Sequence, residues 1–241
     1  MRRTLLILLL TALGLAAVPP RPSASEEVHV VAYVDDSVDA VAALAVMTEA
    51  YRRIGVDVEF RAFPAAEALE ASSNGQTGAE LQRIDGITRR FKTLVQVPVP
   101  INYLQGMAFS NKYTFPVQGW ISLKPYRVGI VKGILFAERG TEGFDVAVAE
   151  NYLQLVQWIV DDKVDVGIMP RISGLHAIQA SGEDIHPLDG VLETLLLYHY
   201  VHESNAPLVP KLAPVLKEML LDGTTQRMRK DTYDKLLWRG S

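Results

Sequence analysis

The stretch VHVVAYVDDSVDAVAALAVMTEAYRRIGVDVEFRA (residues 28–62) decides how the chain begins to fold. Its first seven residues are mostly apolar and β-branched, which is typical of a strand buried on both faces of a parallel sheet. Asp35, Asp36 and Ser37 then form an N-cap cluster for a helix that ends at Gly55. Apolar and charged residues alternate over residues 56–62, which predicts a half-exposed strand. Strand, helix and strand in this order predict a right-handed βαβ unit.

Further alternating elements follow along the chain. We expect a helix over residues 64–73, strands over 79–84, 93–99, 105–110, 126–131 and 164–169, and an amphipathic helix near 152–160. A β-rich run over residues 192–201 and a closing helix over 208–219 come last. Pro214 must lie in the first turn of that helix or kink it. This order predicts a chain that leaves one α/β lobe, builds a second and returns.

The composition excludes several classes of protein. With 241 residues, 49% of them hydrophobic, and a net charge of −4, the chain has the balance of a globular protein. It has no concentrated basic face, so we expect no nucleic-acid partner. It has no cysteine, which excludes thiol catalysis and a lipoprotein anchor. His199 and His202 point to opposite faces of a strand, and no phosphate-binding loop is present, so we expect neither metal nor cofactor.

The N-terminal residues 1–25 resemble a cleavable export signal. Arg2 and Arg3 precede an apolar run from Leu5 to Val18, and small residues around Ser25 suit signal peptidase. An uncleaved anchor helix is the alternative, which we disfavour because fourteen apolar residues are too few for a bilayer of about 30 Å. We therefore expect a periplasmic or secreted protein.

Three later segments carry a family resemblance. LKPYRVGIVKG (residues 123–133) resembles the start of the second lobe in periplasmic solute-binding proteins, the family that includes the amino-acid receptors of ABC transporters. Residues 153–165 are similar to a helix-then-strand segment of that lobe, and residues 193–212 resemble the return to the first lobe in its short exported branch. The resemblance implies the α/β fold of a type 2 periplasmic binding protein. Lobe 1 is expected over residues 26–121 and 192–241, and lobe 2, inserted in it, over 122–191.

The resemblance also implies a function in binding. In that family two lobes close by a hinge motion over a small solute, which the closed receptor delivers to a membrane permease or reports to a sensor protein. We expect a monomer that captures a small polar solute, either an amino-acid-like molecule or an organic anion.

Within lobe 2 the family's ligand positions depart from the amino-acid pattern. The Ser or Thr that helps hold the ligand carboxylate is replaced by Leu135, and the position of the ammonium anchor is Pro170. The backbone amides of Gly133, Ile134 and Leu135 remain, as does the cationic side chain of Arg171. These groups suit an anionic or neutral polar solute better than a standard α-amino acid.

Lobe 1 and the crossover segments supply further candidates. Glu80 and Arg83 lie at a strand end that faces the cleft, where Arg83 is equally well explained as a ligand clamp or as half of a surface ion pair. Asp36 follows a buried strand at the end where α/β sheets bind ligands, although a simple N-cap role is favoured. Trp120 and Tyr198 are candidates for stacking on a solute, with hinge packing the favoured alternative.

Three functions from different classes stay open. A solute-binding protein for an ABC transporter or sensor is favoured, with no enzymatic activity. The second is a receptor-like interaction or sensory module with a degenerate cleft, which a filled, apolar cleft without free donors would favour. The third is a cleft enzyme such as a dehydratase, for which Glu80 and Glu193 are the only acid and base that we can nominate.

Overall fold

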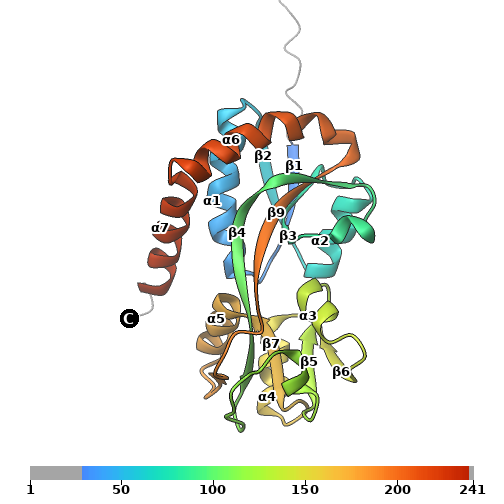
Figure 1. Cartoon of the computed structure of the whole chain (residues 1–241), viewed down its shortest axis with the longest axis vertical. Coiled ribbons are helices and arrows are strands. Elements are labelled where there is room, and N and C mark those ends of the chain that lie inside the picture. Colours follow the sequence, from blue (N-terminus) through green and yellow to red (C-terminus); the bar gives the residue numbers. More distant parts are fainter. Residues whose placement is uncertain (1–28, 239–241) are drawn as a thin grey trace, which may run out of the picture.

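Two α/β lobes are joined by two long strands that run through both of them (Figure 1). The computed structural model describes residues 29–238, so the predicted export signal lies outside the described residues. The connecting strands are β4 (Leu94–Ser110) and β9 (Glu193–His202), which pair antiparallel. Within the described range no helix combines the length and apolarity that a membrane crossing needs.

Lobe 1, the upper half of Figure 1, contains the predicted βαβ unit. Strand β1 pairs in parallel with β2 and β3, and β3 pairs antiparallel with β9. The edge strand β2 alternates between half-buried and exposed residues, whereas β1 is mostly buried, as the sequence patterns predict. The elements are β1 (His29–Val34), α1 (Val38–Arg53), β2 (Val58–Phe63), α2 (Ala65–Ser73), β3 (Ala79–Ile84), α6 (Val209–Leu221) and α7 (Thr224–Trp238).

Lobe 2, the lower half of Figure 1, is built around β5. This strand lies parallel to β6 and β7, and β7 pairs antiparallel with the lower part of β4. The elements are β5 (Val128–Val131), α3 (Leu135–Gly140), β6 (Val146–Ala149), α4 (Tyr152–Val160), β7 (Val166–Pro170), α5 (Arg171–Ser181) and β8 (His186–Pro187). The predicted lobe boundaries near residues 121 and 191 stay a prediction, because β4 and β9 belong to both lobes.

The structure differs from the predicted elements at several places. The two strands expected over residues 93–99 and 105–110 are one strand, β4. Pro214 lies inside α6 beyond its first turn, where Pro210 stands instead. Sequence patterns did not reveal α3, β6, α5 or α7. Because β4 is continuous, the two lobes share one hydrogen-bonded path of strands, in the order β2-β1-β3-β9-β4-β7-β5-β6.

The ladder between β4 and β9 is irregular within lobe 1, just before the strands pass into lobe 2. Its register shifts between Gln96 and Pro100 and again between Pro100 and Asn102. Pro98 and Pro100 have no backbone N–H to donate, so the ladder loses hydrogen bonds there. A strand pair that is weakened at this level can bend, which makes it suitable as a hinge.

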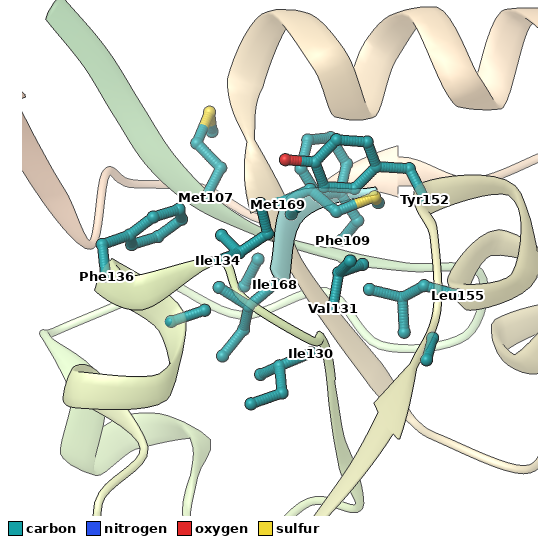
Figure 2. Close-up of a cluster of buried hydrophobic side chains, with 14 of the residues drawn as sticks. Met107, Phe109, Ile130, Val131, Ile134, Phe136, Tyr152, Leu155, Ile168 and Met169 are labelled. Carbon is teal, nitrogen blue, oxygen red and sulfur yellow. The ribbon is translucent and has the colours of Figure 1, made fainter. Parts of the chain in front are cut away.

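Two clusters of buried apolar side chains form the core. One lies wholly within lobe 1, between its sheet and the helices α1 and α6. The other fills lobe 2 and extends across the lobe boundary to Val34, Ala65 and Leu69 of lobe 1. Figure 2 shows the second cluster, in which side chains of β4, β5 and β7 meet Phe136 and Tyr152. Apolar contact therefore continues from one lobe into the other.

A buried histidine lies in the core of lobe 1. His199 of β9 is fully buried, with its Nδ1 3.0 Å from the carbonyl oxygen of Leu81 and its Nε2 2.9 Å from the hydroxyl of Tyr51. A carbonyl can only accept, so Nδ1 donates and the ring is neutral when Nε2 accepts from Tyr51. Burial lowers the pKa of His199 to about 4.

We expect the His199 ring to make the protein sensitive to acid. Its pKa in the folded chain is below the ordinary value of 6.5, so the unfolded chain takes up the proton first as the pH falls. The stability present above pH 6.5 is lost between about pH 6.5 and 4, by about 3 kcal/mol for this group. Urea unfolding at a series of pH values should show a smaller loss for His199→Gln than for the wild type. His202→Gln, at the half-buried end of the same strand, is the control and should keep the wild-type loss.

Candidate functional site

A small cavity lies where the lobes meet. Its volume is about 60 Å³, and its walls come from the end of β1 and the start of α1, from β3, and from the segments of lobe 2 around Leu135, Tyr152 and Pro170. A cavity of this size holds a few water molecules. The ends of β1, β3 and β7 and the starts of α1, α3 and α4 thus surround the position where the family resemblance implies a solute.

Arg83 crosses from lobe 1 to lobe 2 beside this cavity. Its Nε donates to Glu80 Oε1 at 2.8 Å, its Nη2 to the carbonyl oxygen of Ala65 at 2.8 Å, and its Nη1 to the carbonyl oxygen of Gly133 at 3.1 Å. Arg83 is 6% exposed, and Glu80 is fully buried and also accepts from Ser72. Burial raises the pKa of Glu80, and the adjacent guanidinium opposes that shift. Every nitrogen of the guanidinium already has a protein acceptor.

Asp36 caps a helix of the opposite lobe. Its Oδ2 accepts the backbone N–H of Tyr152 at 2.9 Å, at the first position of α4. Helices leave this N–H without an internal partner, and their N-termini attract negative charge. Partial burial raises the pKa of Asp36, which the bond from Tyr152 opposes. The prediction that Asp36 caps its own helix α1 is wrong, since Ser37 is the N-cap there and makes no side-chain capping bond.

A third contact between the lobes joins Asp39 and Ser173. The Ser173 hydroxyl donates to Asp39 Oδ2 at 2.7 Å, and both side chains are buried. Burial raises the pKa of the Asp39 carboxyl, and the hydrogen bond from Ser173 opposes this shift. The three contacts join the turn after β1, the start of α1 and strand β3 of lobe 1 to the start of α4, the start of α5 and the loop after β5.

The backbone of Gly133 touches lobe 1 directly. A Cβ at this position would lie 2.7 Å from the carbonyl carbon of Ala65, so a larger residue would push the lobes apart. The Gly133 N–H, predicted to contact a solute, donates instead to Glu138 Oε1 at 2.7 Å. Ile134 and Leu135 line the cavity with apolar side chains. The amide predicted to hold an anion is thus already paired within lobe 2.

Three other predicted site residues lie away from the cavity. Arg171 is exposed and its Nη1 donates to Gln105 at 3.2 Å. Trp120 donates through Nε1 to Glu193 at 2.6 Å. Tyr198 lines a more open groove of about 550 Å³ on the other face of β9, since its neighbour Leu197 faces the cavity. The structure brings together Asp36, Glu80, Arg83 and residues 133–135, and leaves these three apart.

The acid–base pair nominated for an enzyme is not assembled. Glu80 lines the cavity, whereas Glu193 accepts hydrogen bonds from Trp120 and Arg139 and is absent from the residues that line it. The two carboxyls share no partner. General acid–base chemistry needs both groups within reach of one substrate, which this arrangement does not offer.

Asp39 and Ser173 were not identified from the sequence. One signal for Asp39 was available, because it stands on the same helical stripe as Ala42, Ala43 and Val46, which are all buried. A carboxylate on an apolar stripe needs a partner, so it indicates a specific contact. Ser173 carries no comparable signal.

Comparisons with known proteins agree with the geometry. No protein-family model matches the chain. An uncharacterized protein of Shewanella oneidensis is 26% identical over 195 residues, covering 77% of this chain and 73% of that protein. A histidine kinase sensor domain with similarity to periplasmic binding proteins superposes with a TM-score of 0.74 at 16% identity, covering 86% of this chain and 96% of the other.

Amino-acid receptors are also among the similar structures. An ancestral arginine-binding protein has a TM-score of 0.71 at 15% identity, covering 86% of this chain and 98% of its own. The arginine-, lysine- and histidine-binding protein ArtJ of Geobacillus stearothermophilus has a TM-score of 0.68 at 12% identity, covering 87% of this chain and 94% of the other. The predicted fold is therefore confirmed: this is a type 2 periplasmic-binding-protein-like fold with two α/β lobes. These neighbours are binding proteins and a sensor domain, not enzymes.

Removing Arg83 should destabilise the protein strongly. In Arg83→Ala the buried carboxylate of Glu80 loses its counter-charge, so we expect the free energy of unfolding in urea to fall by about 3–5 kcal/mol. Arg61→Ala, which breaks a half-exposed pair with Glu59, should cost less than about 1 kcal/mol. Adding Glu80→Gln to Arg83→Ala should restore part of the loss. Equal effects of Arg83→Ala and Arg61→Ala would contradict the buried pair.

Proposed function

We propose that this chain is an exported receptor module whose lobes close on each other without a solute, and which acts through a protein partner in the cell envelope. The observation that carries the proposal is the pairing of the cleft: Asp36, Asp39 and Arg83 each bond to the opposite lobe. The partner is a membrane sensor or permease that responds to the state of the lobes. This is the interaction or sensory alternative that a filled cleft favours.

The energetics of closure support this proposal. Closing a cleft removes polar groups from water, which costs free energy unless they find new partners. In a solute-binding protein the solute supplies contacts to both lobes, so closure requires it. Here the opposite lobe supplies those contacts, and apolar packing across the boundary adds to them. Closure is therefore favourable without a guest molecule.

The size of the cavity points the same way. Ligand pockets of proteins measure ~300–1,000 Å³, whereas the cavity beside Arg83 measures about 60 Å³. An amino acid can enter this cavity only if the lobes part or if the Arg83 guanidinium gives up its acceptors. A solute of that size thus competes with closure instead of promoting it.

Substituting Gly133 tests whether direct contact between the lobes holds the closed state. Gly133→Ala sets a methyl group against the backbone of Ala65, so we expect lobe opening, seen as a larger radius of gyration in X-ray scattering. Gly143→Ala is the matched control, because Gly143 has a φ of 81°, close to the 79° of Gly133, but no atom within 4 Å of its Cβ position. The control carries the backbone strain without the clash and should stay closed.

The protein for this experiment is refolded from denaturant, which removes any solute carried through purification. A refolded wild type that scatters as a closed molecule, and does not contract further when amino acids or organic acids are added, supports the proposal. A refolded wild type that is open and closes upon addition of such a compound contradicts it.

A solute carrier for an ABC transporter is the second candidate function. It is favoured by the buried charged side chains of Glu80 and Arg83 in a cavity wall formed by both lobes. Arginine-binding proteins among the similar structures give it further support.

The second candidate makes its own prediction. A carried solute should raise the melting temperature in a concentration-dependent way. Arg83→Ala should then weaken the binding of an anionic solute at least about tenfold, because a charge-assisted hydrogen bond contributes ~1.5–3 kcal/mol. Arg171→Ala should leave the affinity unchanged, since Arg171 contacts Gln105 outside the cavity. A screen of amino acids, organic acids and oligopeptides without any shift in melting temperature would argue against a carrier.

A further inference from the structure

We infer that the C-terminal helix α7 controls the closure of the lobes, with Arg229 as a positioning residue that acts on the cleft through Asn102. The inference rests on the proposed function, because it concerns the same closed state. It assigns a role to α7, which lies beside α1 in Figure 1 and packs against it.

Arg229 binds the hinge region of β4. Its Nε donates to Asn102 Oδ1 at 2.7 Å, and its guanidinium carbon lies 4.1 Å above the centroid of the Tyr103 ring. A second ring, Tyr233 of α7, has its centroid 6.0 Å away. A planar guanidinium suits both a hydrogen bond and stacking on an aromatic face. Arg229 thus attaches α7 to the strand at the level where the β4–β9 register breaks.

Asn102 transmits this contact to the cleft. The residue is buried, and its Nδ2 donates to the carbonyl oxygen of Asp39 at 2.9 Å and to Gln82 Oε1 at 3.0 Å. Asp39 and Gln82 both line the cavity. Oδ1 accepts from Arg229 and also from the backbone N–H of Tyr103 at 2.9 Å, and these two donors hold the amide in the orientation that directs Nδ2 at the cleft.

The connection continues into lobe 2. The carboxylate of Asp39, whose backbone Asn102 holds, accepts the Ser173 hydroxyl. Four residues from α7, β4, α1 and α5 therefore form one path of hydrogen bonds, and the middle members are buried. Loss of Arg229 removes one of the two donors to Asn102 Oδ1, which weakens the hold on the amide, loosens Asp39 and weakens the bond between the lobes. A partner that displaces α7 has the same effect.

Hydrogen exchange at the backbone N–H of Tyr152 measures the opening of the lobes. This N–H is the first amide of α4, so its protection against hydrogen exchange comes from Asp36 across the cleft. Exchange at this amide, followed by NMR, scales with the population of the open state. We expect about tenfold faster exchange in Arg229→Ala, the effect of losing one charge-assisted contact. Exchange at Ile168, within the sheet of lobe 2, should not change.

Two further variants separate this role from simple docking of the helix. Lys230→Ala removes a neighbouring charge on the same helix, where Lys230 pairs with Asp234, and the Tyr152 amide in this variant should exchange as in the wild type. Ser173→Ala should itself speed exchange at Tyr152, and adding Arg229→Ala to it should have little more effect, because both act on Asp39.

The outcomes distinguish the two proposals. If the wild type is closed and the Tyr152 amide exchanges no faster in Arg229→Ala than in Lys230→Ala, the control by α7 is overturned and the proposed function stays intact. Additive effects of Arg229→Ala and Ser173→Ala also overturn it, because they mean independent actions. An unprotected Tyr152 amide in the ligand-free wild type overturns the proposed function, and the role of α7 with it.

Discussion

The guanidinium of Arg83 is the constraint on which the contact between the lobes depends. Arginine keeps its charge at any pH that a protein meets, so a buried arginine must be surrounded by acceptors. Lobe 1 supplies Glu80 and the carbonyl oxygen of Ala65, and only closure supplies the third acceptor, the carbonyl oxygen of Gly133. The glycine is required at the same place, because a side chain there would prevent this approach. One buried charge therefore links the packing of lobe 1 to the position of lobe 2.

Much of the fold could be predicted from local patterns, because those patterns follow burial. The β1–α1–β2 unit, β3 and α4 all lie close to their predicted positions. Strand β1 is a nearly continuous apolar run, and α1, β2 and α4 each have one apolar face. Two strands are predicted over residues 93–99 and 105–110, but the segment between them also belongs to β4, whose ladder tolerates an irregular register around Pro98 and Pro100. Helix α7 has no apolar stripe that a periodicity search could detect, and contacts such as Arg229 with Asn102 hold it in place.

The candidate site was harder to predict than the fold. Glu80 and Arg83 were identified, and they do line the cavity, because charged residues at the end of a buried strand are conspicuous. The pairs Asp36–Tyr152 and Asp39–Ser173 were not identified, because their members lie more than a hundred positions apart in the chain. Such pairs depend on how the lobes approach each other. Local sequence patterns carry no information about that approach.

The distinction between a carrier and a self-closing module rests on a few atoms within a shared fold. Arginine-binding proteins and a kinase sensor domain have the same two lobes as this chain, so the fold alone does not choose between these functions. In this chain Glu138 pairs with the backbone amide of Gly133, and Asp36 pairs with the start of α4. Both are positions where the N–H groups of a binding protein can receive an anionic ligand. Because the protein's own carboxylates already satisfy these donors, a solute that enters has to displace one of them, which is the physical basis of the proposed self-closing module.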